Sequence, residues 1–156
     1  MSQFIEVPQT PYSPPTTFHP HPSVCFSTNG SWGVNLEDAY YGRLDHLDNR
    51  NEPHGIQSGM RIAFRIMWPG YDEWVARNLT VISMGQNSTV HTMHKLVNTL
   101  ATKVHDFYTG MGSPGARPGN DPNWVLQRID FKRLYITELR HVSQGCWQPV
   151  LYYRSD

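Results

Sequence analysis

The chain has 156 residues, with 13 basic and 13 acidic side chains, so its formal net charge is zero. A chain of this length forms one domain and buries enough apolar surface to fold without disulfide staples. Balanced charge gives no general phosphate-binding surface, so neither nucleic acid nor an anionic membrane is an expected partner. It also gives little electrostatic repulsion between copies, which favours self-association.

Targeting signals and cysteines indicate the cellular compartment of the protein. The N-terminus lacks a basic start followed by an apolar stretch, and nowhere do about 18 apolar residues follow one another, so we expect neither a signal peptide nor a membrane span. Cys25 and Cys146 are the only cysteines. They are too few for a disulfide scaffold, and either two reduced thiols or one disulfide fits the sequence. We expect a cytoplasmic protein.

Residues 1–22 form a proline-rich segment that precedes a single α+β domain at residues 23–156. The segment holds six of the twelve prolines, which favours an extended arm and disfavours a helix or a central strand. Its apolar side chains, which could lie across a surface, are Phe4, Ile5, Val7, Tyr12 and Phe18. Two interpretations stay open: a flexible tail, or an arm that wraps a neighbouring subunit.

The next part of the chain predicts a short strand, a turn and a short helix. Residues 23–28 are β-prone, and Asn29-Gly30 is typical of a tight turn. Asn35 is a suitable N-cap for a helix over residues 36–42, whose first turn carries two acidic residues. Residues 45–59 then form a long polar loop.

Residues 61–82 predict an antiparallel hairpin. Large apolar side chains alternate with smaller or polar ones along the first strand, at Ile62, Phe64, Ile66 and Trp68. The Pro69-Gly70 pair then forms a turn, because proline fixes φ and glycine accepts a left-handed conformation. Residues 74–82 return as the second strand.

One long helix is predicted at about residues 89–110. Its apolar side chains recur every three or four residues, at Val90, Met93, Val97, Leu100, Val104, Phe107 and Met111. Ser88 or Thr89 is the expected N-cap, and Gly110 and Gly112 mark the end. The heptad-like spacing also suggests a coiled coil, but frequent threonines weaken an isolated helix, so packing on a sheet is favoured.

The C-terminal third predicts a loop and then a second hairpin. Glycines and prolines exclude regular structure at residues 110–123, and residues 124–128 form a short turn or strand. Strands follow at residues 134–142 and 146–153, and Pro149 predicts an edge position or a bulge because it lacks an N–H donor. The fold class is therefore α+β, an antiparallel sheet with one long helix packed across a face.

Few residues carry the signature of catalysis or metal binding. His91 and His94 are one helical turn apart and are weak candidates for metal ligands, since the glutamate of zinc-protease motifs is missing. His46 lies between Asp45 and Asp48 in the polar loop, but the calcium-loop pattern is absent. Cys25 or Cys146 with His141 could form a nucleophile pair. We expect no cofactor and assign no catalytic residue.

Aromatic residues give a stronger indication, since the chain has five tryptophans and eight tyrosines. Most belong in a core, because each buries a large area. The candidates for an association surface are Trp68, Tyr71 and Trp74 around the Pro-Gly turn, together with Trp32 and Trp147. Burial in the core and exposure in an interaction patch both stay open for these side chains.

One resemblance rests on residues 26–30, 33–39, 66–71 with Trp74, 95–97 and 139–149. In these segments the chain resembles a group of small uncharacterised proteins from mushroom-forming (basidiomycete) fungi. The resemblance spans most of the chain after residue 26. It implies a small intracellular fungal protein and assigns no catalytic residue, ligand or activity.

The sequence as a whole predicts a non-catalytic protein that binds itself, as a homo-oligomer, or another protein. A first alternative is a carbohydrate-binding lectin that uses surface tryptophan and tyrosine side chains. A second alternative is a metal-dependent enzyme that uses His91 with His94, or His46.

Overall fold

The computed structural model describes residues 3–12, 14, 17–56, 61–83, 89–113 and 117–155. Its strands are β1 (Gln3–Glu6), β2 (Val24–Cys25), β3 (Ser27–Thr28), β4 (Ser31–Trp32), β5 (Val34–Asn35), β6 (Arg61–Ile66), β7 (Trp74–Thr80), β8 (Ile82–Ser83), β9 (Thr89–Val90), β10 (Leu134–Ser143) and β11 (Cys146–Ser155). The helices are α1 (Leu36–Tyr40) and α2 (Met93–Met111), with 3₁₀ turns η1 (Leu126–Arg128) and η2 (Phe131–Arg133).

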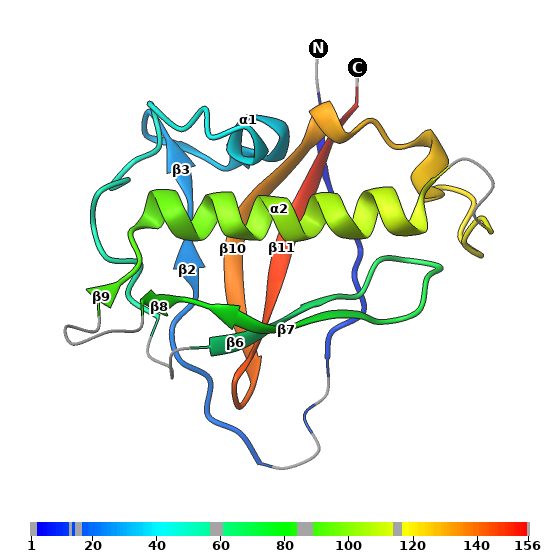
Figure 1. The fold of residues 1–156 in the computed structure, drawn as a ribbon. Coiled ribbons are helices and arrows are strands. Elements are labelled where there is room, and N and C mark those ends of the chain that lie inside the picture. Colours follow the sequence, from blue (N-terminus) through cyan, green and yellow to red (C-terminus); the bar gives the residue numbers. More distant parts are fainter. Residues whose placement is uncertain are drawn as a thin grey trace.

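The main sheet has the order β2-β10-β11-β6-β7, with β1 also paired to β11 and β5 to β10. The long helix α2 crosses one face of this sheet (Figure 1), so the predicted α+β fold is confirmed. The prediction of an entirely antiparallel sheet is wrong for one pair of strands, because β6 runs parallel to β11. Parallel neighbours need a long connection between them, and here the chain through β7 and α2 provides it.

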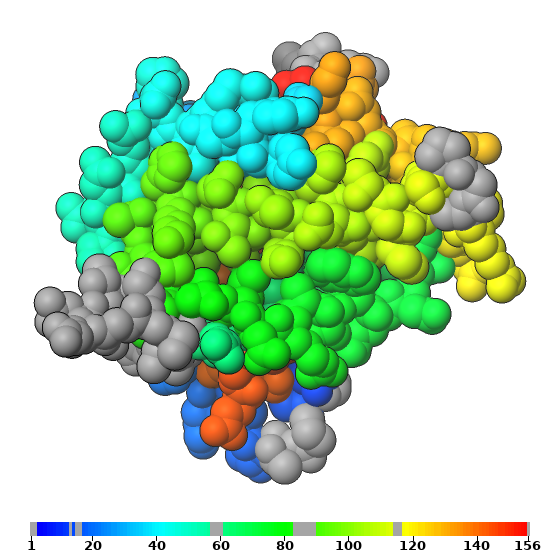
Figure 2. All heavy atoms as spheres, in the orientation of Figure 1, coloured from blue at the N-terminus to red at the C-terminus, as the bar shows by residue number. Residues whose placement is uncertain are grey.

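Helix α2 is held by one apolar stripe, whose members are Met93, Leu96, Val97, Leu100, Ala101, Val104 and Phe107. Figure 2 shows α2 lying between α1 on one side and the β6–β7 hairpin on the other. The helix starts later than predicted, because Thr89 belongs to β9, which pairs with β8. Thr92 is the N-cap and accepts from the Lys95 N–H at 3.2 Å. Ser88 lies outside the described residues.

Two predictions from local sequence are confirmed. The Asn35 side chain caps α1 by accepting from the Asp38 N–H at 3.0 Å. Asn29 and Gly30 both have positive φ, 50° and 76°, and close the β3–β4 turn. The hairpins β6–β7 and β10–β11 also form where the alternation of apolar side chains predicts them.

The proline-rich segment follows the β10–β11 hairpin of its own chain. Strand β1 pairs antiparallel with the end of β11, and the Val7 N–H donates to the Leu151 carbonyl at 2.9 Å. Further along, the Tyr12 ring lies under the Arg65 guanidinium, and Phe18 meets the ring of His141 edge-on. The segment therefore adds a strand to the sheet before it turns into β2.

Strand β11 changes its neighbour on one side at Pro149. Before this residue Cys146 and Trp147 pair with β6, and beyond it residues 152–155 pair with β1. The predicted edge position of Pro149 is wrong, since β10 pairs along its other side. The backbone nitrogen of Pro149, which carries no hydrogen, faces the gap between β6 and β1. No residue of either strand is paired with Pro149 there. The bulge lies nearby on β10, at Thr137.

Glycine at the β6–β7 turn is predicted to be essential for stability. Gly70 has φ of 83°, and a Cβ there would lie 2.5 Å from the Asp121 nitrogen and 2.9 Å from that of Asn120. Gly145 has φ of 71° and no atom within 4 Å of its Cβ position. Gly145→Ala should lower the free energy of unfolding by about 1 kcal/mol through backbone strain alone. Gly70→Ala should lower it by about 3 kcal/mol, since overpacking is added.

Urea unfolding followed by circular dichroism measures both variants. Equal losses of stability in the two variants would contradict the close packing of the 68–71 turn on residues 120–121.

Candidate functional site

The face of the sheet opposite α2 carries a distinctive set of side chains. Tyr135 on β10 pairs with Tyr152 on β11, and their neighbours Leu134, Ile136 and Leu151 are buried in the core. Alternation along the strands therefore points the two tyrosines away from α2. We call the surface formed in this way the open face; its side chains are Phe4, Glu6, Tyr135, Glu138, Arg140, Val142, Gln148, Val150, Tyr152 and Arg154.

One end of the open face is an aromatic groove of about 180 Å³, lined by Phe4, Trp32, Tyr135, Thr137 and Tyr152. Trp32 on β4 reaches over β10, and its ring meets that of Tyr152 edge-on at 5.6 Å. Phe4 meets Tyr135 edge-on at 5.1 Å. Trp32 is 59% exposed and Phe4 is 53% exposed, so both rings present apolar surface to the outside.

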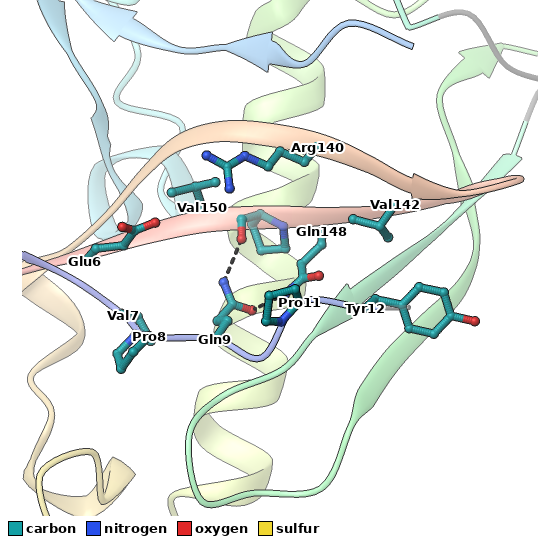
Figure 3. A pocket seen from close by; sticks show the side chains of 11 residues that line it. Glu6, Val7, Pro8, Gln9, Pro11, Tyr12, Arg140, Val142, Gln148 and Val150 are labelled. Atoms are coloured by element: carbon teal, nitrogen blue, oxygen red, sulfur yellow. Dashed lines mark hydrogen bonds between the residues drawn. The ribbon is translucent and has the colours of Figure 1, made fainter. Parts of the chain in front are cut away.

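The other end of the open face is a cleft of about 310 Å³ under the proline-rich segment (Figure 3). We call it the arm cleft. Glu6 and Arg140 lie at one end, near Val150, and Tyr12 lies at the other (Figure 3). The Arg140 Nε–H donates to Glu138 Oε1 at 2.8 Å, and this bond raises the pKa of Arg140. The arm cleft therefore has a firmly cationic group opposite an acidic one.

Tyr152 connects the two hollows. Its ring lines the aromatic groove, and on the arm side it pairs with Glu6. Burial raises the pKa of Tyr152, and the negative charge of Glu6 raises it further. The phenol therefore keeps its proton at neutral pH and can act as a hydrogen-bond donor between an aromatic and a charged region.

Gln9 forms the wall of the arm cleft and fills the gap where β6 leaves β11. Its Nε2–H donates to the Pro149 carbonyl at 2.6 Å, and its Oε1 accepts from the Met67 N–H at 3.0 Å. The Gln148 Nε2–H also donates to Gln9 Oε1, at 3.3 Å. One side chain thus bonds to the backbone of β11 and to that of the residue after β6, as a ladder residue would.

The turn at residues 68–74 faces the core. Trp68 is 1% exposed, and its Nε1–H donates to the Trp124 carbonyl at 2.7 Å. Tyr71 and Trp74 are half-buried against Phe107 on α2, and the Tyr71 hydroxyl accepts from the Leu126 N–H at 2.9 Å. This turn therefore serves packing.

Of the five predicted association residues, only Trp32 is widely exposed. Trp147 is 0% exposed, because it pairs with Phe64 on the side of the sheet that α2 covers. Trp68 and Trp147 are therefore buried in the core, one of the two alternatives that the sequence leaves open for them. Sequence reasoning missed Phe4 and Tyr152 as site residues, although the aromatic and β-branched side chains of Phe4, Ile5 and Val7 favour a strand.

The predicted metal ligands lie in different surroundings. His91 is 8% exposed, and burial lowers its pKa. His94 is part-buried, and His46 is exposed in the polar loop, where its carbonyl accepts from the Asn29 N–H. Within the part of the chain that the structure describes, no group of three or more His, Cys, Asp or Glu side chains could hold a metal ion.

The acidic residues around His46 bond to their own chain. Asp48 Oδ2 accepts from the Ser27 hydroxyl at 2.6 Å and from the Gly30 N–H at 2.8 Å. The Ser27 bond, followed by the Gly30 bond, lowers the pKa of Asp48. Asp45 forms an ion pair with Arg50 at 3.3 Å. These carboxylates therefore fasten the β3–β4 turn and the loop.

Both cysteines are free thiols, Cys25 exposed and Cys146 buried. Cys146 Sγ accepts from the Arg65 Nε–H at 3.3 Å. His141 instead stacks on Trp147 at 4.4 Å, and its Nδ1 accepts from the His21 N–H at 3.0 Å. Cys146 and His141, suggested as a nucleophile pair, therefore each interact with other residues.

His54 is a buried histidine that the sequence did not single out. It is 4% exposed; Nδ1 accepts from the Ile56 N–H at 2.9 Å, and Nε2 lies 2.8 Å from the Val81 carbonyl. The ring must therefore be neutral, with its proton on Nε2. It joins the polar loop to the end of the β6–β7 hairpin, and burial lowers its pKa.

Comparison with known proteins adds no assignment. No protein-family model matches the sequence, and neither a curated protein nor a solved structure matches the chain. None of the helices in the described residues is long and apolar enough to cross a membrane.

Replacement of Gln9 should weaken the whole fold. Gln9→Leu leaves the Pro149 carbonyl and the Met67 N–H without their partner, so the free energy of unfolding should fall by about 2–3 kcal/mol. Gln144→Leu, on an exposed residue of the β10–β11 turn, should change it by less than about 0.5 kcal/mol. Urea unfolding measures both, and equal stability of the two variants would show that Gln9 is no structural bridge.

Acid should destabilise the protein through its buried histidines. The unfolded chain binds a proton at His54 near the ordinary pKa of about 6.5, but the folded chain binds it only at lower pH. The free energy of unfolding should therefore be highest above about pH 7 and should fall between about pH 7 and pH 5.

A matched pair of variants tests how much His54 contributes to this loss of stability in acid. In His54→Gln this pH dependence should be shallower, and in His19→Gln, at an exposed position, it should match the unmodified protein. Urea titrations at a series of pH values measure the slopes. A His54→Gln slope as steep as that of the unmodified chain would contradict the assignment.

Proposed function

We propose that this chain is a non-catalytic binding protein that associates with copies of itself through the aromatic end of its open face. One observation carries the proposal. Four large hydrophobic side chains are exposed in the described residues. Phe4 at 53% and Trp32 at 59% line this end, and Ile5 at 39% lies next to Phe4 on β1, with its side chain on the other face of the sheet. Exposed apolar side chains gathered at one place mark a contact surface, whereas scattered ones are ordinary.

The surroundings of these residues also support contact between proteins. Charged side chains surround the aromatic groove, with Glu6 beside Tyr152 and Arg154 over the Tyr135 ring at 5.9 Å. The Arg154 Nη1–H also donates to the Tyr135 hydroxyl at 3.0 Å. Interfaces commonly have such an aromatic centre and a polar rim, and Trp, Tyr and Arg often carry most of their binding energy. The zero net charge keeps two copies from repelling each other.

Carbohydrate binding is the second candidate function, favoured by the exposure of Trp32 next to Tyr152. An indole beside a tyrosine offers an apolar platform for a sugar ring, and Glu6 and Arg140 supply polar partners close by. Two measurements distinguish the two candidates. A glycan array identifies any sugar that binds, and a titration with that sugar, monitored by tryptophan fluorescence, measures its affinity. Binding of a defined oligosaccharide that Trp32→Ser abolishes would favour the lectin.

We further propose a cytoplasmic location. The two free thiols support it, because reducing compartments keep cysteines unpaired. The resemblance to small intracellular fungal proteins points the same way. Fractionation of cells that express the tagged chain tests this location.

Loss of either aromatic side chain should weaken self-association. The unmodified protein should show a mass above the 18.0 kDa of one chain at about 100 μM, a concentration at which association of μM affinity is complete. Phe4→Ser and Trp32→Ser should each raise the dissociation constant at least about tenfold, because they remove apolar contact area.

Tyr41→Ser is the matched control, since Tyr41 is 62% exposed and lies outside the aromatic groove. Its dissociation constant should equal that of the unmodified chain. Light scattering coupled to gel filtration and sedimentation equilibrium measure the masses. A mass of one chain for the unmodified protein at every concentration would disprove the proposed association.

A further inference from the structure

Strand β1 is an edge strand with exposed side chains along its length. It pairs with β11 on one side, and no described strand pairs with its other side. All four residues, Gln3–Glu6, are exposed. The outer edge therefore presents backbone groups that another strand can bind.

The hydrogen bonds to β11 decide which backbone groups point outward. The Val7 N–H donates to the Leu151 carbonyl, and the Gln3 carbonyl accepts from the Ser155 hydroxyl at 3.3 Å, so both residues direct their backbone towards β11. In an antiparallel strand the backbone N–H and carbonyl groups of successive residues point alternately to one side and the other. The backbone groups of Ile5, like those of Gln3 and Val7, therefore point towards β11. The N–H and carbonyl groups of Phe4 and Glu6 then point outward.

This alternation limits how two copies of β1 can pair around a two-fold axis. An antiparallel pair aligns outward-pointing residues with outward-pointing residues, so the axis passes through Phe4, Ile5 or Glu6. An axis at Glu6 places two carboxylates directly opposite each other, which is destabilising. An axis at Phe4 aligns Glu6 with position 2, beyond the start of β1.

An axis at Ile5 avoids both problems. It aligns Phe4 of each copy with Glu6 of the other, so both outward-pointing residues of both copies exchange their N–H and carbonyl groups. Ile5, which is 39% exposed, then meets Ile5 of the second copy. In this register Glu6 of one copy joins the cross-strand row of Phe4 and Arg154 of the other, which places opposite charges around the Phe4 ring.

We propose that two copies of this chain pair through β1, antiparallel around a two-fold axis at Ile5, to form one continuous sheet. This inference rests on the proposed self-association and specifies its geometry. The two open faces then join, and the aromatic groove of each copy lies next to the axis. The residues that define the association are the backbone of Phe4 and Glu6 and the side chain of Ile5.

Proline at position 6 tests the backbone bonds. Glu6→Pro removes an N–H that points outward and leaves the bonds between β1 and β11 in place. Glu6→Ala removes the same carboxylate but keeps the N–H. The Glu6→Pro dimer should dissociate at least tenfold more readily than the Glu6→Ala dimer, measured by sedimentation equilibrium, while both keep the circular dichroism spectrum of the unmodified protein.

Single cysteines test the register independently of that variant. In a Cys25→Ser background, Ile5→Cys should form an interchain disulfide on mild oxidation, because residues opposite each other at such a position have Cα atoms about 4.5 Å apart. Phe4→Cys and Glu6→Cys should not, since each would lie beyond the ~7 Å limit from its own copy. Non-reducing electrophoresis measures the cross-link.

The outcomes separate the two proposals. Cross-linking at residue 5, together with dissociation by Glu6→Pro, supports the pairing of β1. A dimer that withstands Glu6→Pro, or that cross-links at residue 4 or 6 in place of residue 5, overturns this geometry and leaves self-association standing. A monomeric unmodified protein overturns both.

Discussion

The hydrogen bonds that Gln9 makes in the gap beside β11 hold this architecture together. Buried backbone groups need partners, and β11 loses β6 as its neighbour before it gains β1. Pro149 has no N–H to satisfy there, and Gln9 binds its carbonyl at 2.6 Å. The same amide binds Met67, the residue that follows β6. The proline-rich segment is therefore part of the sheet, and its position brings Phe4 and Glu6 onto the open face.

The helix covers one side of the sheet, and this asymmetry separates structural from exposed aromatic side chains. Trp68 and Trp147 lie on the covered side with Phe107 and Phe64, and they are almost fully buried. Trp32 belongs to a hairpin that reaches over the opposite face, and its side chain stays 59% exposed. Aromatic residues thus stabilise the core on one side, and on the other they remain available to a partner.

The sequence predicts local structure well, because local structure depends on neighbours along the chain. Alternation predicts β6, and Asn35 caps α1 as its short polar side chain suggests. The start of α2 is not determined locally, since Thr89 and Thr92 are both suitable caps and the pairing of β9 with β8 decides between them. Burial of each tryptophan and the sheet partner of β1 depend on contacts between distant segments, which periodicity does not encode.

The length of β1 matters for what its outer edge can do. Exposed edges promote unlimited aggregation, and proteins restrict this with short strands, charges and prolines. Strand β1 has four residues, contains the charge of Glu6 and is followed closely by Pro8. A two-fold pairing uses the outward groups of both copies and leaves none for a third, so growth stops at the dimer. Since Gln9 fixes β1 in place, the hydrogen bonds that complete the fold also shape the edge through which we propose that two copies pair.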